Sequence, residues 1–155
     1  MTPPSARGFT LPEAMLALLV LSILATLALP MLGQMVMTHR VRSASFELLS
    51  TLNYARSEAI KRNDAVAVTA AGPGWESGWQ VTEPGGAVVK LQPQLVTGLR
   101  ITGPGTVIYE RDGRLPQTGA SAIFSVQVEP PREGVEGRCV RIDLTGRVSS
   151  RRGAC

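Results

Sequence analysis

The stretch EAMLALLVLSILATLALPMLGQMVMTH, residues 13–39, decides how this 155-residue chain must be organised. No charged side chain lies between Glu13 and His39. As a helix the uncharged run is about 37 Å long, which is enough to cross a bilayer core of about 30 Å. The run is apolar on every face, so a helix buried inside a small soluble domain is a poor alternative. The stretch therefore predicts a single transmembrane helix.

The rest of the chain has a different composition. It is polar and punctuated by Gly and Pro, as in soluble globular domains, and its length suits one compact domain plus an extension. The net charge is +4, and six arginines fall between Arg132 and the C-terminus, against three acidic residues. Such a basic end suits either an anionic partner or a solvated tail.

The next stretch, residues 40–62, continues the helical pattern in an amphipathic form. Its apolar stripe consists of Val41, Ala44, Leu48, Leu52, Ala55 and Ala59, with Leu49 and Ile60 beside it. The charged residues are placed on the outer face: Arg40, Arg42, Glu47, Arg56, Glu58, Lys61 and Arg62. We expect this stripe to pack on the remainder of the same chain.

After Asn63 and Asp64 the pattern changes to a period of two, which is typical of strands. We expect strands at 65–70, 78–82, 87–91, 99–102, 106–110, 122–128, 138–144 and 147–149. Turn signals at 84–86, 112–113 and 145–146 separate some of them. Strands that follow one helix, without alternating βα units, predict an α+β fold with a long N-terminal helix packed on an antiparallel sheet.

The two cysteines, Cys139 and Cys155, both lie near the C-terminus and form no CxxC motif. Outside the cytosol they would pair in a disulfide, whereas in the cytosol they would stay reduced. On the loop-closure model such a bond removes about 3 kcal/mol of unfolded-state entropy. The compartment therefore decides their state.

A secretory signal peptide is the main alternative interpretation of the N-terminus. Arg7 supplies a weak basic region, and residues 26–28 resemble a cleavage site. Two features argue against it. Glu13 stands at the mouth of the apolar run, where a carboxylate costs a few kcal/mol unless something neutralises it. The helical pattern also continues unbroken into residues 40–62.

The segment GFTLPE, residues 8–13, resembles the processing site of type IV pilins and type II secretion pseudopilins. The resemblance implies cleavage after Gly8 by a prepilin peptidase and N-methylation of Phe9. It also implies that Glu13 neutralises the terminal amine of a neighbouring subunit in the filament core. A buried carboxylate is tolerable when it is paired with a buried ammonium, and a helix N-terminus favours negative charge.

Two further segments resemble the GspH/FimT branch of these proteins. They are WESGWQV, residues 75–81, and the closing hairpin CVRIDLTGRV, residues 139–148, which runs into the terminal Cys155. Packing is the expected role of the two tryptophans, one as a core anchor and one as cover for an edge strand.

Members linked to DNA uptake carry a basic G-R-x-R ending, but Ser149 replaces its second arginine here. The resemblance makes Arg147, Arg151 and Arg152 the candidates for non-specific DNA binding.

No constellation of catalytic residues is found in the sequence, which is therefore interpreted as non-enzymatic. His39 is the sole histidine and is expected at the membrane interface. No phosphate-binding glycine motif and no Cys/His cluster occurs, so no cofactor or metal is expected.

The resemblance implies a minor pilin or pseudopilin of the bacterial inner membrane, incorporated into a type IV pilus or a type II secretion pseudopilus. It further implies that residues 1–8 are a leader, 9–39 a transmembrane and assembly helix, and 40–155 a periplasmic domain. The implied partners are other pilins, the inner-membrane assembly platform, prepilin peptidase and DNA. The alternative is a single-pass inner-membrane protein whose periplasmic β-domain is unrelated to filaments.

Overall fold

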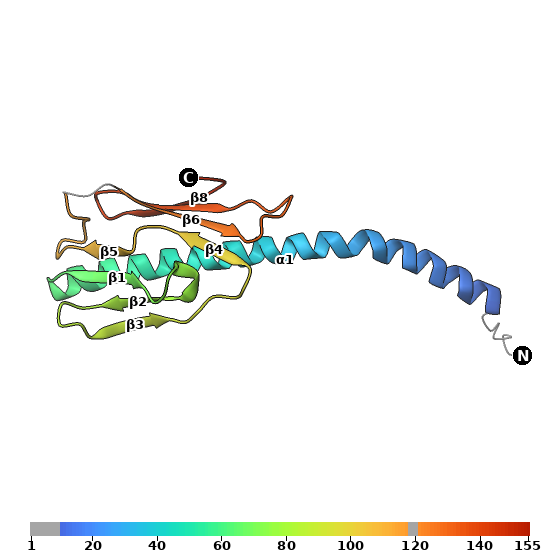
Figure 1. Cartoon of the computed structure of the whole chain (residues 1–155), viewed down its shortest axis with the longest axis horizontal. Helices are drawn as coiled ribbons and strands as arrows, with labels where there is room; N and C mark the ends of the chain where they lie inside the picture. The colour runs from blue at the N-terminus through green and yellow to red at the C-terminus, as the bar shows by residue number, and fades with distance from the viewer. Residues whose placement is uncertain (1–9, 118–120) are drawn as a thin grey trace, which may run out of the picture.

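The computed structural model describes residues 10–117 and 121–155, which form one long helix followed by eight strands (Figure 1). The elements are α1 (Leu11–Arg62), β1 (Val66–Ala70), a 3-10 turn η1 (Trp75–Ser77), β2 (Trp79–Thr82), β3 (Val88–Gln92), β4 (Leu99–Thr102), β5 (Thr106–Tyr109), β6 (Ala122–Val128), β7 (Arg138–Ile142) and β8 (Val148–Arg152). This order confirms the predicted α+β class.

The helix α1 is continuous from the apolar run through the amphipathic stretch, as predicted. It begins at Leu11 with a proline in its first turn, where the missing N–H has no helical partner to lose. It ends at Arg62, and the cap residue Asn63 adopts the left-handed conformation with φ of 53° and donates its N–H to the Ile60 carbonyl at 3.2 Å.

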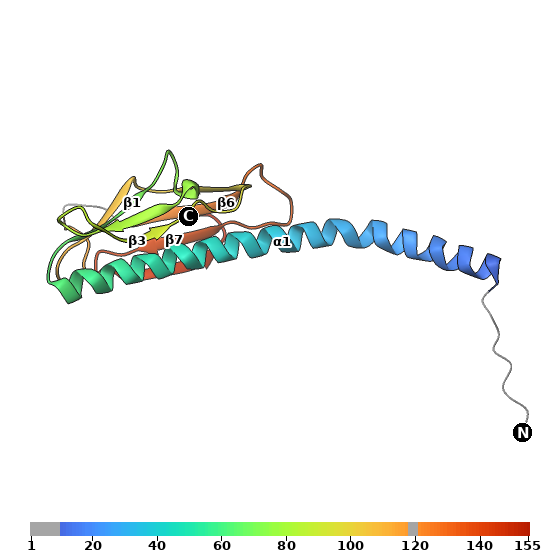
Figure 2. The same ribbon diagram turned by 90° about the horizontal axis from the view of Figure 1, so that it is seen from below.

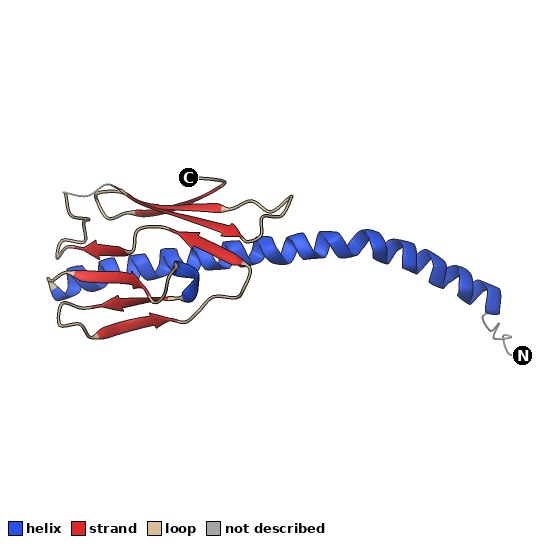
Figure 3. Ribbon diagram, viewed as in Figure 1, coloured by secondary structure: helices blue, strands red, loops and turns tan. Residues whose placement is uncertain are grey.

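The strands are antiparallel, as predicted, and they divide between two four-stranded sheets (Figure 3), a division that the sequence pattern does not predict. The first sheet has the order β3-β2-β1-β5 and the second has the order β4-β6-β7-β8. The division arises because β4 pairs with β6, with Leu99 opposite Val128, and not with the earlier strands. Alternation predicts where a strand lies but not which strand it pairs with.

The second half of α1 supplies the centre of the core and packs against both sheets. All six residues of the predicted stripe are at most 2% exposed. One charged residue was placed wrongly, because Glu58 is only 8% exposed and not on an open outer face. Lys61 and Arg62 neutralise this carboxylate, and the hydrogen bond from Arg62 lowers the pKa of Glu58.

The two tryptophans are both buried. Trp75 stacks edge-on against Phe124 with ring centroids 4.9 Å apart, and its indole N–H donates to the Pro104 carbonyl at 2.8 Å. Trp79 lies on β2, which has a neighbour on each side, so it is a core residue and not the predicted cover of an edge strand. The WxxGW segment therefore fills the space between the two sheets.

The first half of α1 projects beyond the β-domain, which covers only the second half (Figure 2). The described side chains of residues 10–26 and 31–36 are exposed. By length and composition α1 is the one helix in the described part of the chain able to cross a membrane.

Candidate functional site: an exposed apolar helix and a disulfide-closed hairpin

The projecting half of α1 is an apolar surface without any covering element in the described residues. Its large side chains are open to solvent, as Leu18 at 65% exposed and Leu24 at 57% exposed illustrate. Glu13 lies in the first turn and is exposed as well. The predicted processing residues Gly8 and Phe9 lie outside the described residues. This surface needs either lipid or other helices around it.

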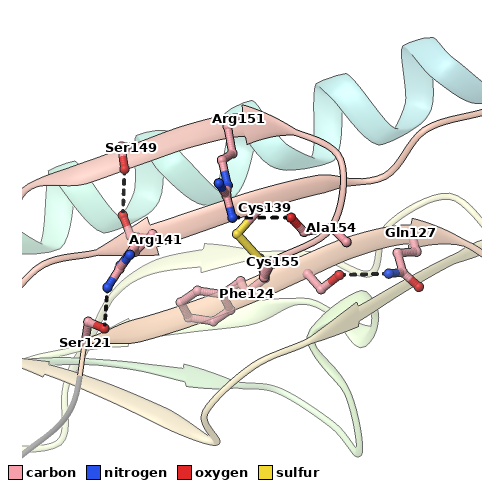
Figure 4. The surroundings of a disulfide bond; sticks show 10 residues. Ser121, Phe124, Gln127, Cys139, Arg141, Ser149, Arg151, Ala154 and Cys155 are labelled. Atoms are coloured by element: carbon pink, nitrogen blue, oxygen red, sulfur yellow. Dashed lines mark hydrogen bonds between the residues drawn. A yellow bond between two sulfur atoms is a disulfide. The ribbon is translucent and has the colours of Figure 1, made fainter.

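The second feature is the C-terminal hairpin of β7 and β8, which a disulfide closes (Figure 4). Cys139 on β7 is joined to Cys155 with a Cα–Cα distance of 5.1 Å. The chain turns back after β8 at Gly153, whose φ is 89° and whose N–H donates to the Gly137 carbonyl at 2.9 Å. The bond therefore holds the last residue of the chain against the second sheet, close to Phe124.

The hairpin turn is fixed by Asp143, which accepts hydrogen bonds from the Thr145 hydroxyl and from the Arg147 N–H. Both bonds lower the pKa of the Asp143 carboxyl, and the bond from Thr145 has the larger effect. The turn also contacts α1, because the Arg56 guanidinium donates to the Thr145 carbonyl at 3.1 Å. The turn is thereby tied to the buried half of the helix.

The strand β8 runs to Arg152, whereas the predicted strand ended at Ser149. The extension occurs because β7 offers partners as far as Arg138, which lies opposite Arg152. Arg151 and Arg152 are thus strand residues whose side chains leave opposite faces of the sheet. Arg152 faces a groove beside α1, and Arg151 faces away from it (Figure 4).

The structure therefore does not bring the three candidate arginines together. Arg151 lies on the outer face of β8 and Arg152 on the other face, whereas Arg147 precedes the strand, about 13 Å from Arg151 along an extended chain. The outer face carries one more arginine, Arg141 on β7, opposite Ser149 and diagonal to Arg151. Sequence reasoning missed Arg141, although the alternation of its strand places it on the same face as Cys139.

The described residues contain no group of three His, Cys, Asp or Glu side chains that could hold a metal ion. His39 is exposed and lies directly after the apolar run.

Two family models match this chain. The model described as type II transport protein GspH matches residues 44–146, and that of the prokaryotic N-terminal methylation motif matches residues 4–29. The first match covers more than half of the sequence.

The chain belongs to the GspH family.

A comparison with curated proteins gives no match. Among solved structures, the type IV minor pilin FimU of Pseudomonas aeruginosa is similar in two crystal forms. In the first the TM-score is 0.65 at 22% identity, covering 73% of this chain and 89% of that chain. In the second the TM-score is 0.59 at 23% identity, covering 71% and 91%. This likeness shows that the GspH-family chain has a type IV pilin fold, with the long helix and antiparallel sheets of that fold.

The two matched regions contain some of the candidate functional residues and leave others out. The methylation motif includes Gly8, Phe9 and Glu13. The GspH match ends at Gly146, directly before Arg147. The GspH-family chain is thus a pilin-like subunit of the minor pilin and pseudopilin type, and its basic C-terminal residues lie beyond the matched region.

Proposed function

We propose that this GspH-family protein is made as a precursor and processed into a subunit of a type IV pilus or type II secretion pseudopilus. In this proposal a prepilin peptidase cuts after Gly8, and Phe9 is methylated. Residues 9–39 then span the bacterial inner membrane, and residues 40–155 fold in the periplasm. The assembly platform later transfers the subunit from the membrane to the filament.

One observation carries this proposal. The described side chains in the apolar first half of one helix are exposed, whereas the apolar stripe of its second half is buried in a folded domain. Water solvates such an exposed surface poorly. Lipid is suited to cover it before assembly, and the helices of neighbouring subunits are suited to cover it afterwards.

Glu13 has a role of its own in this proposal. As the acidic residue of the first turn, it would pair with the terminal ammonium of an adjacent subunit once both leave the water. The pair would set the axial register between neighbouring helices.

The mass of the mature N-terminus tests the proposal. The expected chain begins at methylated Phe9, and replacing Gly8 by a large residue should leave the precursor uncut. A mature start near Leu29 would instead indicate a conventional signal peptide. An uncut protein that is absent from purified filaments would support the alternative of a single-pass membrane protein unrelated to filaments.

The C-terminal disulfide gives a separate test of the compartment in which the domain folds. If the domain is periplasmic, Cys139 and Cys155 stay oxidised in protein taken from cells, as they are joined here. Alkylation of the native protein before reduction should then label neither residue. Labelling of both would place the domain in a reducing compartment.

We also propose non-specific DNA binding as a second function, supported by the outer face of the hairpin. Arg141 and Arg151 share that face, and Arg147 directly precedes β8. The ion pairs within the described residues involve none of these three arginines. The disulfide limits the freedom of the strand that carries Arg151, which lowers the entropy lost on binding a phosphate backbone.

A salt titration of duplex DNA binding by the full-length protein in detergent tests this second function. Three phosphate contacts predict a slope of about −3 in log affinity against log salt concentration. The triple Arg→Gln variant at 141, 147 and 151 should lose binding. The matched control is the triple variant at 42, 138 and 152, which removes the same charge elsewhere. Equal binding by both variants would rule out the outer face as a DNA site.

A further inference from the structure

A groove separates α1 from the end of the β7–β8 hairpin that lies nearer the projecting helix. It encloses about 540 Å³. Its lining consists of Thr38, Val41 and Arg42 from the helix, residues 134–137 from the preceding loop, Arg138 from β7 and Arg152 from β8. Glu136 is the one acidic side chain among these described residues. The groove therefore combines three guanidinium groups with a single carboxylate.

The arginines of this groove are arranged in a way that is unfavourable without an anion. Arg138 and Arg152 lie directly opposite each other in the register of β7 and β8, where like charges destabilise a sheet. Arg42 approaches from the helix, and its guanidinium carbon lies 5.6 Å from the centre of the Phe46 ring. The guanidinium carbon of Arg138 lies at the same distance from that ring.

No ion pair found within residues 10–117 and 121–155 offsets this charge. The pairs present there involve Lys61, Arg62, Arg100 and Arg114, and none involves the groove arginines. Phe46 instead holds two of the guanidinium groups by cation–π contacts, which orient them but leave their N–H donors available. The arrangement suits a ligand with several anionic oxygens.

The position of the groove along α1 indicates where such a ligand would come from. Arg42 lies about 7–8 Å along the helix axis beyond Met37, the last apolar residue of the uncharged run. The loop at Gly134 reaches back to Gln34, since a Cβ on Gly134 would lie 3.0 Å from the Gln34 side-chain oxygen. The groove thus opens at the level where lipid headgroups begin, if the apolar run fills the hydrocarbon core.

We propose that this groove binds the phosphate headgroup of an anionic phospholipid in the membrane leaflet nearest the β-domain. Arginine binds phosphate through two parallel N–H donors, and the three arginines that line the groove supply such donors. Val41 and Val135 supply an apolar wall for the glycerol end of the lipid. This inference rests on the proposed membrane-spanning role of α1.

The bound lipid has a defined mechanical role. It ties the β-domain to the bilayer surface through β7, β8 and the helix at once, so it fixes the depth and tilt of α1 before assembly. Departure of the subunit into a filament requires this headgroup to be released. A phospholipid is favoured over duplex DNA in this groove. The outer face proposed to bind DNA, which carries Arg141 and Arg151, lies on the opposite side of β7 and β8.

Calorimetric titration of the full-length protein in neutral detergent tests the proposal, with short-chain dihexanoyl phosphatidylglycerol as the probe. Dihexanoyl phosphatidylcholine and inorganic phosphate serve as comparison ligands. We expect phosphatidylglycerol to bind at least tenfold more tightly than either. The triple Arg→Gln variant at 42, 138 and 152 should lose this preference, and the triple variant at 141, 147 and 151 should keep it. Far-ultraviolet circular dichroism checks that each variant is folded.

Several outcomes would overturn the inference. Equal binding of both lipids shows that the anionic headgroup is not recognised, and equal binding of inorganic phosphate shows a site for free anions. An unchanged preference in the groove variant places the site elsewhere. Carbonate-resistant association with vesicles separates this inference from the proposed function. A protein that inserts without a headgroup preference refutes only the lipid site, whereas a protein that does not insert refutes the membrane-spanning role.

Discussion

The two halves of α1 share one continuous backbone, yet they are built for different surroundings. Leu24 in the first half is 57% exposed, and Leu52 in the second half is fully buried. The first half is apolar on every face, and the second half confines its apolar residues to one stripe. The comparison shows that the number of apolar residues and their distribution around a helix together determine what covers it.

The largest effect is expected from Glu13→Val, which removes the one charged side chain in the exposed half of α1. An unpaired terminal ammonium inside the filament costs about 3–5 kcal/mol, so incorporation should fall by more than a hundredfold. The monomer should still fold and insert. Quantitative blotting of purified filaments measures the change, and Glu47→Val, beyond the apolar run, is the control. Normal incorporation of the Glu13 variant would show that the carboxylate pairs with nothing in the filament.

The same substitution in the two halves gives the most direct comparison. Leu52→Ala should lower the free energy of unfolding of the β-domain by about 2–5 kcal/mol, because it opens a cavity in a packed core. Leu24→Ala should leave that free energy unchanged, because Leu24 lies in the half of α1 that projects beyond the β-domain and is 57% exposed. Denaturant titration followed by the fluorescence of the buried Trp75 and Trp79 measures both. A similar loss in both variants would mean that the two halves are not independent.

A smaller effect is expected where two turns pack beside the buried half of the helix. Gly146 has a φ of 77°, and a Cβ there would lie 1.9 Å from the Gly113 carbonyl oxygen. Gly146→Ala should therefore cost about 1–3 kcal/mol of domain stability. Gly85→Ala is the control, since a Cβ at Gly85 meets no atom within 4 Å. Equal unfolding midpoints would contradict the close packing of the two turns.

The smallest expected effect is a change in the pH dependence of stability, which Asp143 in the same turn contributes. The pKa of Asp143 is lowered in the folded protein, so the folded state binds its proton less readily than the unfolded chain does. Its contribution to stability is complete above the ordinary value of about 4 and is lost as the pH falls through the lowered pKa. Asp143→Asn should flatten the acid side of the stability curve. Identical curves for both proteins from pH 6 downward would exclude this role.

The sequence by itself determined the helix and the places of the strands. The apolar run and the stripe from Val41 to Ala59 follow from side-chain periodicity, a local property that any compact fold must respect. The family likewise followed from local segments, GFTLPE at the N-terminus and WESGWQV in the middle. The cysteines were seen as a possible pair, and the structure joins them.

Only the tertiary structure decided which strands pair and which side chains meet. A period of two shows that Arg151 and Arg152 point to opposite faces only after both are known to lie in one strand. The pairing of β4 with β6 splits the strands into two sheets, and the register of β7 with β8 sets Arg138 opposite Arg152. These arginines are far apart in sequence from Arg42, and local patterns carry no information on contacts between distant segments. The groove that they form was therefore visible only once α1 and the hairpin were placed side by side.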